Sequence, residues 1–164
     1  MKCLLLLRHG EAEPTGAAAG DFERPLTPHG RAQAQHAAHC LRRTHCLPET
    51  ILASPALRAR ETATIVAALL TRLQALRYDT AAYPGSAEAL LQLVRSLPEA
   101  SDTLLLVSHN PGLTTLANEY AAHLHTGQSG STLALATGGL CRIDFAGSSW
   151  SSVDSGATDV TLLS

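Results

Sequence analysis

The sequence predicts an α/β protein, a three-layer α/β/α sandwich with a mainly parallel central sheet and one antiparallel addition. Short apolar runs alternate with longer amphipathic segments along most of the chain, an order typical of parallel strands joined by helices. Two of these runs, Lys2–Leu7 and Thr103–Val107, are rich in leucine and almost continuously apolar, as expected for central strands that are buried on both faces.

The first strand is followed by a loop and a helix. Lys2–Leu7 is too short for a helix, and residues 11–21 contain one proline and two glycines, which predict a loop. Thr27 then offers an N-cap and Pro28 a first helical position, so we expect a helix over residues 28–43.

The same order of strand and helix is then repeated. Thr50–Ala53 is a short apolar strand, and Ser54 and Pro55 repeat the capping signal. They predict a second helix over residues 56–76, in which apolar residues recur at four-residue spacing on one face. Residues 77–79 are expected to form either a short strand or a loop.

A third helix is expected to begin after Ser86. This residue offers an N-cap, and Glu88 places an acidic side chain in the first turn, where it suits the helix dipole. The second central strand, Thr103–Val107, comes next, and a fourth helix is predicted over residues 113–123.

The end of the chain predicts a β-hairpin and a tail. After a polar turn at residues 128–131, strands are expected at residues 133–136 and 140–145, joined by a turn at residues 137–139 that contains two glycines. Residues 146–164 are rich in serine and glycine, and we expect them to be a loosely ordered tail.

The length favours one domain, spanning residues 1–164. Hydrophobic residues make up 45% of the chain, and a chain of this size buries an adequate core without disulfides or metals. Residues 160–163 could add an edge strand to the sheet of that domain.

The charge balance points away from nucleic acids and membranes as partners. Twelve basic and fourteen acidic residues give a net charge of −2, and the apolar run near the N-terminus is too short for a signal peptide or a membrane span. The basic residues are eleven arginines and a single lysine, Lys2. Coding bias accounts for such a ratio, but so do sites that require a planar guanidinium.

The cysteines favour a protein of the cytoplasm. None of the four has a C-x-x-C partner, which makes a zinc ribbon or a dithiol redox motif unexpected. Scattered cysteines in a chain that can build its own core are typical of buried, reduced thiols. They are Cys3, Cys40, Cys46 and Cys141.

Two histidines directly follow the two most apolar strands. His9 comes after Arg8 at the end of the first strand, and His109 comes before Asn110 at the end of the second. Ligands of α/β sheets bind beyond the carboxyl ends of central strands. If these two strands are neighbours, we expect both imidazoles to enter one crevice.

Two arginines can complete an anion site at that edge. Arg58 lies in the first turn of a predicted helix, where backbone N–H groups are free and the dipole favours anions, and its guanidinium adds forked donors. Arg24 lies in the loop after the first strand and could reach the same mouth. Such a set suits a phosphoryl group, whose oxygens must be neutralised during transfer.

The chemistry expected of this set requires no metal and no cofactor. The sequence has neither a metal-ligand motif nor a glycine-rich P-loop, so the cations must be side chains. A neutral imidazole could attack phosphorus and form a phosphohistidine intermediate, which water would then hydrolyse. The other histidine, if protonated, would donate to a phosphoryl oxygen.

Three segments resemble the motifs of a known family. Leu7–Glu11 is similar to the RHG signature of the histidine phosphatase superfamily, the phosphoglycerate mutase-like proteins. The segment Ser54–Ala63 resembles its second arginine motif, and Val107–Asn110 resembles its second histidine motif. The short length and the segment Arg24–Thr27 are similar to the SixA-type branch, the small phosphohistidine phosphatases.

The resemblance implies a role for each motif residue. It implies that His9 is the phosphorylated nucleophile and that Arg8, Arg58 and His109 hold the phosphoryl group. Arg24 would be an accessory phosphate contact.

The proton donor is the part of the family pattern that this chain lacks. Larger branches carry an acidic insertion that protonates the leaving alkoxide, and no such insertion is present. Asp21, Glu11 and Glu88 are the possible replacements. An imidazole that leaves from phosphohistidine has a pKa near neutrality and needs less help, so a phosphoramidate substrate is compatible with a missing acid.

These expectations describe a cytoplasmic, metal-independent phosphatase that acts on a phosphorylated protein, in signal transduction, through phospho-His9. Three alternatives stay open. The first is a phosphomonoesterase of the same family that acts on a small phosphorylated metabolite. The second is a non-catalytic module that binds phosphate or a phosphoprotein. The third is a metal hydrolase that uses His9, His109 and Glu11.

Overall fold

A computed structural model describes residues 1–16, 20–71, 75–124, 132–153 and 156–164. These residues form one mixed sheet of six strands in the order β3-β2-β4-β1-β5-β6. The strands are β1 (Lys2–Arg8), β2 (Thr50–Ala53), β3 (Ala75–Tyr78), β4 (Thr103–Ser108), β5 (Leu140–Phe145) and β6 (Ala157–Leu162).

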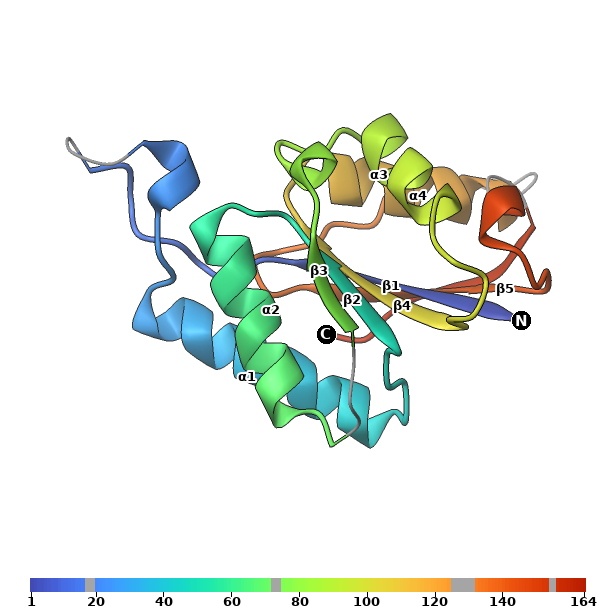
Figure 1. Ribbon diagram of the computed structural model, residues 1–164, viewed down its shortest axis with the longest axis horizontal. Coiled ribbons are helices and arrows are strands. Elements are labelled where there is room, and N and C mark those ends of the chain that lie inside the picture. Colours follow the sequence, from blue (N-terminus) through green and yellow to red (C-terminus); the bar gives the residue numbers. More distant parts are fainter. Residues whose placement is uncertain (17–19, 72–74, 125–131, 154–155) are drawn as a thin grey trace.

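Helices cover both faces of the sheet, so the predicted three-layer sandwich is confirmed (Figure 1). The pair α1 and α2 lies on one face, and the pair α3 and α4 lies on the other. The helices are α1 (Pro28–Arg43), α2 (Leu57–Leu69), α3 (Ala87–Arg95) and α4 (Gly112–Leu124), with 3-10 turns η1 (Asp21–Glu23), η2 (Thr80–Ala82) and η3 (Trp150–Ser152). Within the described ranges, no helix has the length and apolar character that crossing a bilayer requires.

The strand directions agree with the prediction of a mainly parallel sheet. β1 pairs in parallel with β4, β4 with β2, and β2 with β3. Only β5 runs against the others, since it pairs antiparallel with both β1 and β6. The inner residues of β1 and β4 are fully buried, which is why both strands read as continuous apolar runs.

The caps of α1 and α3 are as predicted, but α2 is shorter than expected. Ser54 does not cap α2, because its hydroxyl bonds to His109 and the helix begins only after Ala56. At the other end, Leu70 takes an extended conformation after the last helical residue. Ala75 then pairs with Thr50, so the edge of the sheet takes residues that helical spacing assigned to α2.

The predicted hairpin is wrong in its first strand. Residues 133–136 are not a strand, although β5 occupies the predicted range 140–145. Asn118 bonds to both the N–H and the carbonyl of Leu133, and Arg8 and Asn110 both donate to the carbonyl of Leu135. Side chains of other elements therefore take the backbone groups that a strand ladder would have used. The polar turn expected at residues 128–131 lies outside the described residues.

Residues 146–153 and 156–164 differ from the loosely ordered tail that the composition of this segment suggested. They include η3 and the edge strand β6, which begins at Ala157, earlier than the predicted residues 160–163. Trp150 is fully buried, and its indole N–H donates to the carbonyl of Ser101 at 2.7 Å. The segment is therefore part of the core on the α3–α4 side.

Lys2, the chain's only lysine, holds β1 to the segment before β4. Its ammonium group donates to the carbonyls of Glu99 and Ser101 at 2.7 and 2.9 Å and to the carboxylate of Asp102 at 3.1 Å. It also lies 5.3 Å from the ring centre of Trp150. A compact ammonium with three donors fits this cage, whereas a planar guanidinium would not.

We expect Lys2→Met to lower the free energy of unfolding by about 2 kcal/mol, because the oxygens around its buried ammonium group lose a charged donor. Chemical denaturation measures the change. Arg42→Met, on the exposed end of α1, is the control and should stay within about 0.5 kcal/mol of the parent. Equal effects of the two substitutions would contradict the role given to Lys2.

Candidate active site

The structure places His9 and His109 side by side at the carboxyl edge of the sheet. β1 pairs with β4, and the N–H of His9 donates to the carbonyl of Ser108 at 3.2 Å. The two ring centres lie 5.0 Å apart, and the side chains are only 7% and 4% exposed. The expected single crevice with two imidazoles is therefore present.

His9 presents one ring nitrogen to the site as a free base. Its Nδ1 lies 2.7 Å from the carbonyl oxygen of Gly10, so Nδ1 carries the proton and donates there. Burial, followed by the positive charges of Arg58 and Arg8, lowers the pKa of His9 to about 4. The ring is then neutral near pH 7, and its Nε2 has a lone pair, which accepts a hydrogen bond from Arg58 Nε at 3.3 Å.

The position of Arg58 relative to the first motif is fixed by close backbone packing. The Thr62 hydroxyl donates to the carbonyl of Arg58 at 2.7 Å and accepts from the N–H of Gly10 at 3.0 Å. A Cβ on Gly10 would lie 2.3 Å from the carbonyl oxygen of Gly30, and one on Gly30 would lie 2.0 Å from that of Glu11. Only glycine permits α1, α2 and the first motif to meet this closely.

Asp21 binds both Arg58 and Arg24, two of the arginines that are predicted to contact phosphate. Its backbone carbonyl and carboxylate accept from the guanidinium of Arg58 at 2.7 and 3.0 Å, and its carboxylate accepts from Arg24 at 3.0 Å. The hydroxyl of Tyr83 donates to it at 2.8 Å. The hydrogen bond from Tyr83 and the guanidinium of Arg58 lower the pKa of Asp21 to about 2. Asp21 is therefore ionised near neutral pH, which argues against it as the proton donor.

The structure does not bring the other two acidic candidates into the cluster. The Glu11 carboxylate accepts from the hydroxyl of Thr27 at 2.9 Å, at the start of α1. Glu88 lies on an exposed part of α3, where it accepts from Gln92 at 2.8 Å. Neither carboxylate has a hydrogen bond with a histidine or arginine of the site among the described contacts.

Two buried side-chain nitrogens at this site have no hydrogen-bond partner within the described protein. They are Nε of Arg8 and Nδ1 of His109. The rest of each side chain is held in place, since Arg8 Nη1 donates to the carbonyl of Leu135 at 3.1 Å and His109 Nε2 lies 2.7 Å from Ser54 Oγ. Buried polar atoms are almost always paired, so both atoms are candidates for contacts with a ligand.

Sequence reasoning missed two residues of this site. Tyr83 has its ring edge-on to His109 at 5.4 Å and to Phe22 at 5.1 Å, and no motif marks it. Ser54 was interpreted as a helix cap. It directly follows β2, as His9 and His109 directly follow their strands, so the same rule about strand ends would have found it.

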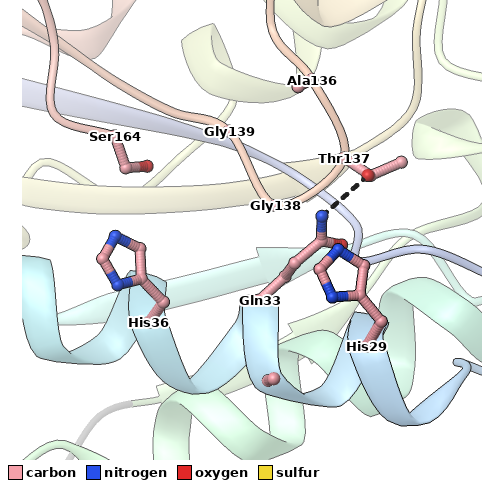
Figure 2. Close-up of a pocket in the computed structure, with 9 residues that line it drawn as sticks. His29, Gln33, His36, Ala136, Thr137, Gly138, Gly139 and Ser164 are labelled. Carbon is pink, nitrogen blue, oxygen red and sulfur yellow. Dashed lines mark hydrogen bonds between the residues drawn. The ribbon is translucent and has the colours of Figure 1, made fainter.

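A cavity of about 440 Å³ lies between α1 and the segment that leads into β5 (Figure 2). Gln33 crosses it and donates to the hydroxyl of Thr137 at 3.0 Å. The cavity is lined by His29, Ala32, Gln33, His36, Ala136, Thr137, Gly138, Gly139 and Ser164. None of the predicted site residues lines it. Among the residues that the structure describes, no three His, Cys, Asp or Glu side chains form a group that could hold a metal ion.

Comparison with known proteins identifies relatives of this arrangement. The sequence model of the histidine phosphatase superfamily (branch 1) matches residues 4–80, which include the first histidine motif and the Arg58 motif. An uncharacterized protein from Picosynechococcus sp. is 36% identical over 138 residues, which cover 84% of this chain and 81% of that protein.

Solved structures with a similar fold include two proteins named as phosphohistidine phosphatases of the SixA type. The one from Nakamurella multipartitia has a TM-score of 0.84 and 26% identity, and the match covers 98% of this chain and 95% of that chain. The one from Agrobacterium tumefaciens has a TM-score of 0.75 and 25% identity, over 88% of this chain and 92% of that chain.

The buried histidines predict how stability changes with pH. An unfolded histidine titrates near pH 6.5, whereas burial lowers the pKa of His9 to about 4 and that of His109 to about 3. Between these values the unfolded chain binds more protons than the folded one. The free energy of unfolding should therefore be fully retained above about pH 6.5 and fall as the pH is lowered toward 4.

Chemical denaturation at a series of pH values measures this slope. His9→Gln should remove part of it, because the substituted side chain takes up no proton in either state. His39→Gln, on an exposed face of α1, is the matched control. A full slope in His9→Gln would show that the buried imidazole is not responsible.

Proposed function

The chain belongs to the histidine phosphatase superfamily, in its SixA-type branch, and on that premise we propose that it hydrolyses phosphohistidine in a protein substrate through a phosphorylated His9. The enzyme is a phosphatase, and the proposal concerns its substrate and the roles of its residues. The four free cysteines suit the cytoplasmic role in signal transduction that we include in the proposal.

One observation supports the proposal: an unprotonated imidazole nitrogen and two unpaired buried nitrogens belong to residues that lie together at one edge of the sheet. His9 Nε2 is available as a nucleophile because Nδ1 is bound to Gly10. Arg8 Nε and His109 Nδ1 lack protein partners, and Arg58 Nε already points at His9 Nε2. A phosphoryl group attacked by His9 would accept hydrogen bonds from Arg8 Nε and His109 Nδ1, and the guanidinium of Arg58 would balance its charge.

The proposed reaction has two displacements. In the first, His9 Nε2 forms a bond to phosphorus as the bond from phosphorus to the substrate's imidazole nitrogen breaks. The substrate ring, protonated on its other nitrogen, keeps the electron pair and leaves as neutral imidazole. In the second, water attacks the same phosphorus, His9 Nε2 leaves, and inorganic phosphate is released. The arginines balance the charge of the transferred group throughout, and Arg24 contributes through Asp21 at the mouth.

Two features of the mouth favour phosphohistidine over a phosphate ester. Asp21 is ionised and bound to two guanidiniums, so it is a poor acid, whereas an alkoxide leaving group needs one. Phe22 and Tyr83 pack edge to face beside His109, and they offer an aromatic surface to a leaving imidazole.

The intermediate can be trapped. Rapid quenching during turnover, followed by mass spectrometry under alkaline conditions, should find one acid-labile phosphate on His9. His9→Ala should show none and should lose phosphatase activity, because the attacking nitrogen is gone. Trapped phosphate on any other residue of the wild type would overturn the assignment of His9.

The substrate class is tested by direct competition. We expect phosphate release from a phosphohistidine-containing protein domain to have a kcat/KM at least about 100-fold above that for sugar phosphates, the range that a missing general acid accounts for. Turnover of the sugar phosphates alone would support the small-molecule phosphomonoesterase. Tight binding of phosphate without turnover of any substrate would support the non-catalytic module.

A further inference from the structure

We propose that Ser54 is a positioning residue that fixes the tautomer of His109, with the imidazole proton on Nδ1. The inference rests on the proposed function in one respect, because the Nδ1–H group is the one that would donate to the phosphoryl oxygen. The resemblance assigned Ser54 no role, and its sequence context suggested only a helix cap.

The sheet brings the two residues together. Ser54 follows β2 and His109 follows β4, and the N–H of Ser54 donates to the carbonyl of Val107 at 2.9 Å, which continues the pairing of the two strands. This register places Ser54 Oγ 2.7 Å from His109 Nε2. Ser54 is 0% exposed and His109 is 4% exposed, so water has little access to the contact.

The hydrogen bonds around Ser54 decide which atom donates. Its oxygen accepts from the N–H of Ala56 at 3.2 Å, and its own proton needs an acceptor. Among the described contacts, that acceptor is His109 Nε2. The hydroxyl therefore donates to the ring, Nε2 is unprotonated, and the single proton of a neutral imidazole lies on Nδ1.

The opposite tautomer would leave one more buried group unsatisfied. Nδ1 has no protein partner in either tautomer, but if His109 Nε2 donated to Ser54, the hydroxyl proton would also have no acceptor among the described residues. A lone pair on Nδ1 would also repel the oxygens of a phosphoryl group, whereas an N–H group attracts them.

The ring of His109 is neutral and carries a single proton, so the nitrogen that holds this proton decides whether the ring can donate to a ligand. Burial, followed by the charges of His9 and Arg58, lowers the pKa of His109 to about 3. From the sequence, we expect this histidine to donate if it is protonated. In the structure a neutral ring suffices, provided that its one proton is on the nitrogen without a protein partner.

Nuclear magnetic resonance reads the tautomer directly. With ¹⁵N-labelled histidine, two-bond proton–nitrogen correlations should show His109 protonated on Nδ1 in the wild-type enzyme. Addition of inorganic phosphate should shift this Nδ1–H resonance downfield as the hydrogen bond forms. In Ser54→Ala the nitrogen shifts should move toward a mixture of the two tautomers.

Kinetics supply the second measurement. Ser54→Ala should lower kcat about tenfold with a smaller change in KM, less than the roughly 100- to 1,000-fold cost of deleting such a donor, because part of the population keeps the proton on Nδ1. Ser54→Thr keeps a hydroxyl and should restore the tautomer. Thr50→Val is the matched control, since it also removes a buried hydroxyl, one at the other end of β2 that bonds to Ser101 and not to a histidine.

The control should keep both the tautomer of His109 and the kcat of the parent. A proton on Nε2 in the wild type, or an unchanged tautomer in Ser54→Ala, would overturn the inference. The test is separable from that of the proposed substrate, because the resonance and its response to inorganic phosphate need no turnover. An enzyme that leaves phosphohistidine intact and still shows the Nδ1 proton would lose the substrate assignment and keep the role of Ser54.

Discussion

The site depends on the parallel pairing of β1 with β4. Leu7 lies opposite Val107 and Arg8 opposite Ser108, so both strands reach the carboxyl edge at the same level and the next residue of each is a histidine. A shift of this register by one residue would turn every side chain of a strand to the opposite face, which would bring apolar groups where the imidazoles belong. The hydrogen bond from the N–H of His9 to the carbonyl of Ser108 continues this register to the edge, and in this way the pairing of the two strands sets the geometry of the chemistry.

Sequence patterns could predict the helix starts and strands that depend only on residues close together in the sequence. Thr27 caps α1 because an N-cap and a proline suffice for a helix start, and the two buried strands are set by their apolar runs. The same reasoning placed His9 and His109 at one edge of the sheet. This reasoning was wrong where a residue distant in the sequence binds the side chain that was expected to cap a helix. Ser54 carries a capping signal, but a histidine from a strand that begins about fifty residues later takes its hydroxyl.

Hydrophobic periodicity could not predict the positions of residues in irregular segments. Tyr83 follows η2, and its position against His109 depends on how that connection folds over the sheet. Composition was equally misleading at the end of the chain, where many small polar residues surround one tryptophan. Trp150 packs against the ammonium of Lys2 and fills the core, so one large side chain outweighs the character of its neighbours.

The single lysine and the arginine at the site bind different sets of acceptors, because these acceptors are arranged differently in space. Lys2 meets three oxygens from different directions, which suits an ammonium. Arg58 lies against His9 with Nε and against Asp21 with both terminal nitrogens, so all sides of its planar fork are used at once. The Asp21 carboxylate is 46% exposed and so remains partly hydrated, whereas the guanidinium it neutralises is buried. In the proposed reaction, a phosphoryl group that reached Arg58 would replace the Asp21 carboxylate with an anion of higher charge, so the buried cation would be balanced before and after.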